Sequence, residues 1–330
     1  MNTHFGKAVS VCLITLALAT FGWGAHAQAA EKASLRLSWL IVANFAPFFM
    51  GVDKGFYKAE GIDLSIHEGK GSSLAAQLVA QKKNTFGITD AGVLIKSIEN
   101  GLPIKMVWCH TQTNPMSVLS NSAKGIRAPM DLIGKKIAGS ARSSMTLLFR
   151  PMLRRNKLDP SKVEVFNSSP PFHPLVLAGK VDAMLGYWPD NVPKLEEFGV
   201  KVSVIKYADW GLNTLSNGLT SHHDTIAKQP DRVRRFVRAS ARSWQYAQTH
   251  IEEAIDSLMP RMIKGKRSTQ VQTLKNTMQG LYTKNSKGKP LGWMSPKDWK
   301  ETVDTLYETG LLKTRSPIDR YYTNQFLPGT

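Results

Sequence analysis

Two glycine- and serine-rich segments stand at predicted strand-to-helix turns, where they could bind an anion or a carbonyl oxygen. EGKGSS covers residues 68–73, and GSARSS covers residues 139–144. Glycine allows a tight turn and serine caps the helix, whose first backbone N–H groups can then face a ligand. The first segment is not a Walker loop, because glycine follows its GK pair and no glycine stands at the upstream spacing. The candidate ligand-binding residues here are Ser72, Ser73, Ser143 and Ser144, with an ordinary structural turn as the alternative.

Aromatic side chains follow predicted strands at their carboxyl ends, where open α/β sheets bind ligands. Trp39 and Phe45 come after the first strand, and Tyr187 and Trp188 belong to the segment GYWPD, residues 186–190. Such rings can stack on a flat ligand or fill an interface between two lobes. They favour a small, flat, partly polar molecule, such as a substituted pyrimidine or an aromatic acid. A nitrate or short alkanesulfonate, which would not need several rings, is the alternative.

One acidic residue, Asp90, directly follows the strand predicted at residues 86–89. Its carboxylate could pair with an amino group of a ligand, or it could cap the helix that follows.

No catalytic or metal-binding motif is present. The sequence contains neither G-x-S-x-G nor H-E-x-x-H. His222 and His223 would point to opposite faces of a strand and cannot chelate an ion alone. Cys109 fits a buried core cysteine. We therefore expect no catalytic residue, no metal and no cofactor.

Short apolar runs alternate with helical patterns, which indicates an α/β fold with mainly parallel sheets. The first series runs to residue 110 and the second from 136 to 205, and the chain is predicted to be helical from about residue 226. The strands are expected at Leu35–Trp39, 63–67, 86–89, 104–110, 136–138, 163–166, 183–186 and 202–205. The helices are expected at Ala46–Lys58, 73–81, 91–100, 143–157, 174–178, 193–198 and 230–250.

Lysine and arginine number 43 against 25 acidic residues, a formal charge of +18 in 330 residues. Such a charge favours anionic surroundings without choosing among nucleic acid, lipid and small ligands. In the helix predicted at 230–250, Val233, Phe236, Val237 and Trp244 form one face. Arg234, Arg235, Arg238 and Arg242 form the other. No aromatic residues interleave these arginines, so we predict a solvated face and no nucleic-acid partner.

The first 27 residues have the pattern of a secretory signal peptide. Lys7 is their one formal charge, an apolar run extends from Val9 to Phe21, and Ala25-His26-Ala27 supplies a cleavage site before Gln28. The run is shorter than the ~18 residues of a membrane-spanning helix, so an uncleaved anchor is the weaker alternative. The mature chain is therefore expected to be exported. One cysteine would remain, and it cannot form an internal disulfide.

The sequence resembles the periplasmic binding proteins of ABC importers, in the group for nitrate, sulfonate, taurine and thiamine-pyrimidine precursors. The signature W-L-x-x-x-N-F-A-P-F-F-x-G-V-D-K-G-F-Y-K-A-E-G-I-D-L covers residues 39–64. The resemblance continues through QLVAQKKNTFGITDAG, GLPIK, DLIGKKIAG, LAGKVDAMLGYW and PDRVRRFVRA, and covers roughly residues 35–250.

The resemblance implies a type II periplasmic binding protein with two lobes that close on a ligand by hinge motion. Residues 28–115 and 217–330 would form the first lobe and residues 116–216 the second. Crossing segments are expected near Thr113–Leu119 and Thr214–Thr220. Asn44 in the signature, and Thr113 and Asn217 in the crossings, complete the expected ligand-binding set.

The same family includes a thiamine-pyrimidine synthase that uses pyridoxal phosphate. The resemblance would place its lysine just after the third strand, where this chain has Thr89 and Asp90. The enzyme's cysteine-rich segment would fall at 216–220, which here reads SNGLT. Both departures favour a binding protein over an enzyme. The expected partners are a small-molecule ligand and an inner-membrane permease with its ATPase, and we expect a periplasmic monomer.

Overall fold

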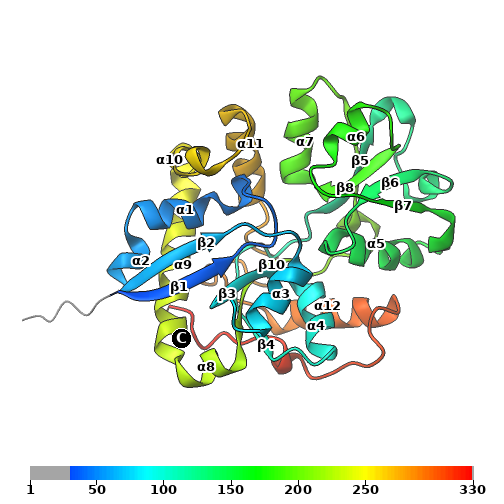
Figure 1. Ribbon diagram of the computed structural model, residues 1–330. Coiled ribbons are helices and arrows are strands. Elements are labelled where there is room, and N and C mark those ends of the chain that lie inside the picture. The colour runs from blue at the N-terminus through cyan, green and yellow to red at the C-terminus, as the bar shows by residue number, and fades with distance from the viewer. Residues whose placement is uncertain (1–29, 329–330) are drawn as a thin grey trace, which may run out of the picture.

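The computed structural model describes residues 30–328, and the predicted signal peptide lies outside them. The chain forms two α/β lobes, each built on a five-stranded sheet (Figure 1). One sheet has the order β2-β1-β3-β10-β4 and the other β7-β6-β8-β5-β9. Each is mixed, because β10 and β5 run antiparallel to both of their neighbours. The predicted two-lobed α/β architecture is confirmed.

The first lobe contains the N-terminal strands and most of the C-terminal third of the chain. Its strands are β1 Glu31–Arg36, β2 Ile62–His67, β3 Phe86–Asp90, β4 Ile104–Cys109 and β10 Asn217–His222. Its helices are α1 Ala46–Asp53, α2 Phe56–Ala59, α3 Ser72–Ala80, α4 Ala91–Glu99, α8 His223–Lys228, α9 Pro230–Thr249, α10 Ile251–Leu258, α11 Arg267–Met278 and α12 Pro296–Glu308.

The second lobe is smaller and formed by the middle of the chain. Its strands are β5 Met116–Asn121, β6 Lys136–Gly139, β7 Glu164–Asn167, β8 Ala183–Tyr187 and β9 Val202–Lys206. Its helices are α5 Ser144–Arg155, α6 His173–Leu177 and α7 Trp188–Glu197.

Three predicted elements differ from their observed bounds by several residues. The first strand was expected to reach Trp39 but ends at Arg36, where its partner β2 also ends. The helix expected at 46–58 breaks at Gly55, whose φ of 71° is left-handed. The helix expected from Pro193 begins at Trp188. Pro189 lies in its first turn, where proline is tolerated, and Pro193 lies inside the helix.

The crossings between the lobes begin about three residues earlier than expected. Residues 110–115 connect β4 to β5, and residues 211–216 lead to β10. The rest of each predicted crossing is strand, since β5 begins at Met116 and β10 at Asn217. These are the two antiparallel strands, and each lies between two others in its sheet.

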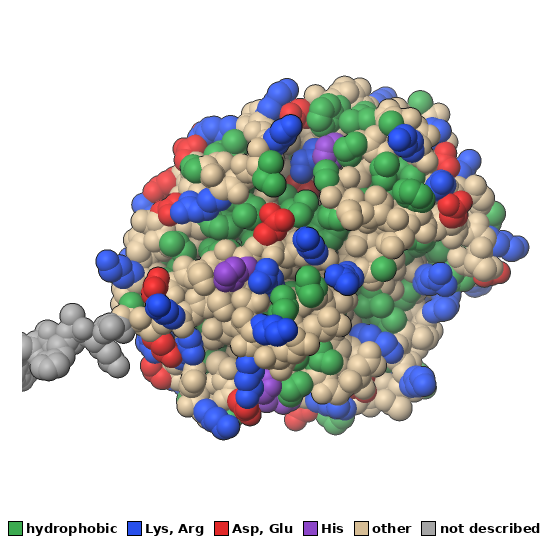
Figure 2. Space-filling model, viewed as in Figure 1, with side chains coloured by type: hydrophobic (Ala, Val, Ile, Leu, Met, Phe, Trp, Pro, Cys, Tyr) green, Lys and Arg blue, Asp and Glu red, His purple; other side chains and the backbone are tan. Residues whose placement is uncertain are grey.

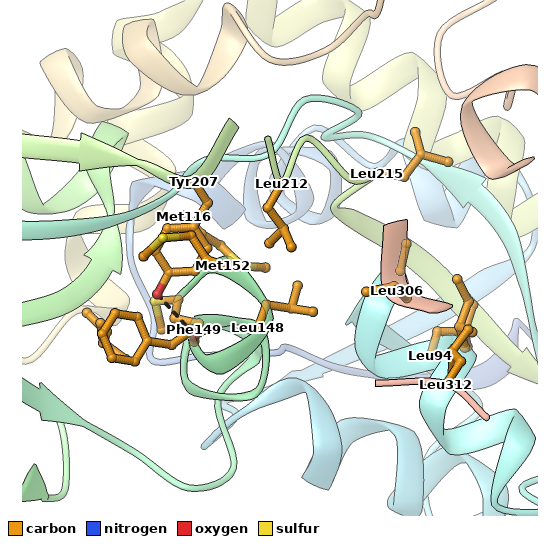
Figure 3. Packing of buried hydrophobic residues seen from close by; sticks show 14 of the residues in the cluster. Leu94, Met116, Leu148, Phe149, Met152, Tyr207, Leu212, Leu215, Leu306 and Leu312 are labelled. Carbon is orange, nitrogen blue, oxygen red and sulfur yellow. Dashed lines mark hydrogen bonds between the residues drawn. The ribbon is translucent and has the colours of Figure 1, made fainter. Parts of the chain in front are cut away.

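The lobes touch at several places around the cleft. A single hydrophobic cluster continues from one lobe into the other. Figure 3 shows Leu148 and Met152 of the second lobe facing towards Leu306 and Leu94 of the first. Two polar contacts also join the lobes. Thr269 Oγ1 of the first lobe donates to Glu197 Oε2 of the second at 2.6 Å, and Arg155 Nη1 lies 2.7 Å from Glu308 Oε2.

The arginines of α9 are held by the protein's own acidic and aromatic side chains. Arg235 pairs with Asp231 and Glu31, and Arg238 pairs with Glu60. Figure 2 shows basic side chains scattered over the visible face and interspersed with acidic ones. This distribution differs from the continuous basic stripe of a nucleic-acid-binding surface.

Candidate functional site

A cavity of about 60 Å³ lies between the two lobes. Five segments form its wall: the loop after β1, the start of α3, the start of α5, the loop before α6, and the junction of β8 with α7. The predicted residues that line it are Trp39, Asn44, Phe45, Ser72, Ser143, Ser144 and Tyr187.

Aromatic rings reach this cavity from both lobes. Trp39 comes from the first lobe, and its ring centroid lies 6.1 Å from that of Phe172 in the second, at an interplanar angle of 58°. Phe45 is buried beside them, and Tyr187 enters from the end of β8. Trp39 and Phe172 are in direct contact, and a flat ligand could stack beside this pair.

Two helix starts supply polar groups to the same cavity. Ser143 caps α5 by accepting a hydrogen bond from the Thr146 N–H at 3.2 Å, and Ser144 begins the helix. Ser72 begins α3, and its hydroxyl accepts a hydrogen bond from the Asp90 N–H at 3.2 Å. The helix dipoles favour carbonyl or anionic oxygens at these ends.

The backbone just before α3 lies very close to the second lobe at Gly71. Gly71 has a φ of 122°, and a Cβ built on it would lie 2.2 Å from the carbonyl oxygen of Arg142. Its own N–H donates to Ser38 O at 2.8 Å within the first lobe. Only glycine lets the two lobes approach so closely at this point.

A second cavity, of about 210 Å³, adjoins the first. Asn44 and Tyr187 line both cavities. The Tyr187 hydroxyl lies 3.2 Å from Ser144 Oγ and donates to Asn217 Oδ1 of the first lobe at 3.5 Å. The predicted residues Thr113, Trp188 and Asn217 line this second cavity. The cleft therefore has two compartments that share Asn44 and Tyr187 in their walls.

Two predicted residues, Ser73 and Asp90, line neither cavity. Asp90 is fully buried and caps α4, because its Oδ1 accepts from the Gly92 N–H at 2.9 Å. Its Oδ2 and the Ser216 hydroxyl form no hydrogen bond of regular geometry among residues 30–328, but the hydroxyl lies near enough to the carboxylate to favour its ionised form. Burial raises the pKa of Asp90 to about 7. The predicted alternative, that Asp90 caps the following helix, is therefore confirmed for Oδ1, and Oδ2 takes no part in the cap.

We expect Asp90→Asn to remove a pH dependence of stability. The folded pKa of about 7 exceeds the unfolded value near 3.9, so folding favours the protonated acid. Its contribution is complete below about pH 4 and is lost as pH rises through 7, a change of up to about 4 kcal/mol. Asparagine keeps the cap without titrating.

Chemical denaturation between pH 4 and 8 measures this effect, with Asp63→Asn, an exposed aspartate on β2, as the control of equal charge change. The Asp90→Asn variant should gain stability relative to the parent as pH rises. Parallel pH curves for parent and variant would refute the titration of Asp90 in this range.

Several lining residues were not predicted from the sequence. Phe172 lies in the segment PPFHP, residues 170–174, just beyond β7. Its position after a predicted strand could have marked it as a candidate. Asp190 and Lys194 face the first cavity as an ion pair at 3.5 Å. His110 and Lys206 line the second cavity, and no local pattern marks either of them.

Cys109 and His222, for which no ligand-binding role was predicted, both have structural roles. Cys109 is buried with a free thiol, as predicted. His222 accepts a hydrogen bond from the Asp224 N–H and so caps α8. Within residues 30–328, no group of three or more His, Cys, Asp or Glu side chains could hold a metal ion. None of the helices in this part of the chain is both long enough and apolar enough to cross a membrane.

Known proteins share both sequence and fold with this chain. Residues 42–254 match the model of the family described as NMT1/THI5 like. The riboflavin-binding protein RibY of Chloroflexus aurantiacus is 26% identical, over 91% of this chain and 87% of that protein. A 4-amino-5-hydroxymethyl-2-methylpyrimidine phosphate synthase of Legionella pneumophila is 20% identical, over 91% and 93%.

Among solved structures, the alkanesulfonate-binding protein SsuA of Xanthomonas axonopodis pv. citri has the same fold. Its TM-score is 0.68 at 17% identity, covering 90% of this chain and 100% of that one. The family model matches more than half of the chain. This protein therefore belongs to the NMT1/THI5-like family.

Proposed function

We propose that this protein is the solute-binding component of an ABC importer and that it captures a flat nitrogen heterocycle between its lobes. The observation that carries the proposal is the interlobe cavity with Trp39 and Phe45 on one side and Tyr187 and Phe172 on the other. A site that needs both lobes suits capture by closure and release by opening.

The charge of the first cavity favours a neutral, polar ring. Its acidic and basic side chains, Asp190 and Lys194, pair with each other and leave little net charge. The hydroxyls of Ser72 and Ser144 can serve the ring's carbonyl and amino groups. The names of the relatives, one a riboflavin-binding protein and one a pyrimidine phosphate synthase, refer to ligands that contain a pyrimidine ring.

The residues at the end of the third strand, β3, favour binding over catalysis. The resemblance places a pyridoxal phosphate lysine just after this strand. Here Thr89 Oγ1 is hydrogen-bonded to Thr220 Oγ1 at 2.5 Å, and Asp90 caps α4. Neither side chain can form an imine with an aldehyde, because neither carries an amine. We therefore propose that the protein is not an enzyme.

We propose that the lobes comprise residues 28–115 with 217–330, and 116–216. The strand orders support this division, because β1 to β4 and β10 share one sheet and β5 to β9 share the other. The crossings at 110–115 and 211–216 would then form the hinge.

We also propose a periplasmic location and delivery of the ligand to an inner-membrane permease and its ATPase. The leader at residues 1–27 supports export. Exported protein should then begin at Gln28 on amino-terminal sequencing, and a start at Met1 would contradict cleavage.

A ligand panel tests the proposed function. Thermal unfolding would be followed with riboflavin, an aminopyrimidine, an alkanesulfonate and nitrate. A heterocycle at 100 times its Kd should add about 2.7 kcal/mol to stability. If only the alkanesulfonate or nitrate stabilises the protein, the ligand is a small anion and the heterocycle proposal is wrong. A Schiff-base absorbance with added pyridoxal phosphate would favour the synthase.

A further inference from the structure

The second cavity differs from the first in charge. Lys206, the last residue of β9, lines it and extends its Nζ over the Trp188 ring, 4.5 Å from the centroid. Among residues 30–328, Lys206 forms no ion pair, whereas Lys194 of the first cavity is paired with Asp190. The lining residues of the second cavity include no aspartate or glutamate. This compartment is therefore positively charged.

A buried histidine supplies a second polar group to this compartment. His110 is 1% exposed and lies among Phe48, Trp108 and Trp244. Its Nδ1 has no hydrogen-bond partner within the described part of the chain. Burial lowers its pKa to about 3, so the ring is neutral at physiological pH and can exchange a hydrogen bond with a hydroxyl or an oxygen.

The remaining walls are rich in hydroxyl and amide groups. Thr111 and Thr113 come from the first crossing, and Asn276 and Gln279 come from α11 and the residue after it. Oxygen-rich chains are matched by such donors and acceptors. Because Tyr187 and Asn44 line both compartments, one ligand can place a ring in the first and a side chain in the second.

We propose that the second cavity is a subsite for an anionic, oxygen-bearing side chain of the ligand, with Lys206 as the residue that selects its charge. The inference rests on the proposed function, because it assumes that the ring occupies the first cavity. Trp188 would hold the ammonium group in place through the cation–π contact and so act as a positioning residue.

Three probes with one ring system test this subsite. Lumichrome carries the flavin-type ring alone, riboflavin adds a polyhydroxyl chain, and riboflavin 5′-phosphate adds a charged group at its end. In the parent protein the phosphate ester should bind at least tenfold more tightly than riboflavin at low salt. Lys206→Met should abolish that preference and its salt dependence, while changing lumichrome affinity less than twofold.

Lys201→Met is the matched control, because it removes the same charge from an exposed residue just before β9. It should leave all three affinities unchanged. His110→Phe keeps an aromatic ring and should reduce the preference for riboflavin over lumichrome.

The outcomes separate the two proposals. Failure of all three probes to bind would overturn the heterocycle site and the side-chain subsite together. Binding of lumichrome with no gain from the phosphate, or an equal loss for all probes in Lys206→Met, would overturn the subsite and leave the ring site standing.

Discussion

Gly71→Ala is expected to lower the affinity for a bound heterocycle by at least tenfold while the protein remains folded. The added Cβ would lie 2.2 Å from the Arg142 carbonyl oxygen across the cleft. That oxygen belongs to the backbone and cannot move aside as the end of a flexible side chain would. The clash exists only when the lobes are together, and the substitution therefore shifts the equilibrium towards an open form.

Affinity and small-angle scattering measure this effect together. The parent should become more compact when ligand is added, and the variant should not. Gly179→Ala is the control, because Gly179 also has a positive φ, of 65°, but nothing lies within 4 Å of its Cβ position. Both variants carry backbone strain, so both should lose some stability. Unchanged affinity in Gly71→Ala would show that this contact does not limit closure.

Trp39→Ala is expected to weaken heterocycle binding about 30-fold. Its ring forms one wall of the first cavity, beside Phe172 of the other lobe. Loss of a large apolar face costs about 2 kcal/mol, which corresponds to about 30-fold in Kd. Because Trp39 is only half-buried and lies in a loop, the fold should tolerate the change.

Isothermal titration of parent and variant measures the loss. Tyr307→Ala, on α12 and 38% exposed, is the aromatic control and should bind as the parent does. Affinities within twofold of the parent in Trp39→Ala would rule out a ring-stacking role for this residue.

Local patterns were sufficient to predict most elements of the fold. Alternating apolar runs placed β2, β3, β4, β8 and β9 within about a residue of their observed ends. The strands β5 and β10 were read as parts of crossings, because their place between other strands depends on pairing with distant segments. The break at Gly55 has the same cause, since either backbone conformation is open to glycine until packing selects one.

Local patterns predicted the candidate-site residues that follow strands, whereas Asn44, Thr113 and Asn217 were expected from the family resemblance. Trp39, Ser72 and Tyr187 stand at such positions, and the structure brings them to one cavity. Asp90 follows a strand too, but its carboxylate turns into the start of α4. His110 and Lys206 meet in one compartment only because the lobes come together, and sequence periodicity carries no information about that approach.

A crystal structure of the mature protein with the tightest-binding heterocycle of the panel tests the central claim most directly. We expect a planar ring in the first cavity, in contact with Trp39 of one lobe and Tyr187 of the other. A ring bound to the outer surface of a single lobe, or an interlobe cavity that remains without the ring at saturating ligand, would contradict capture between the lobes.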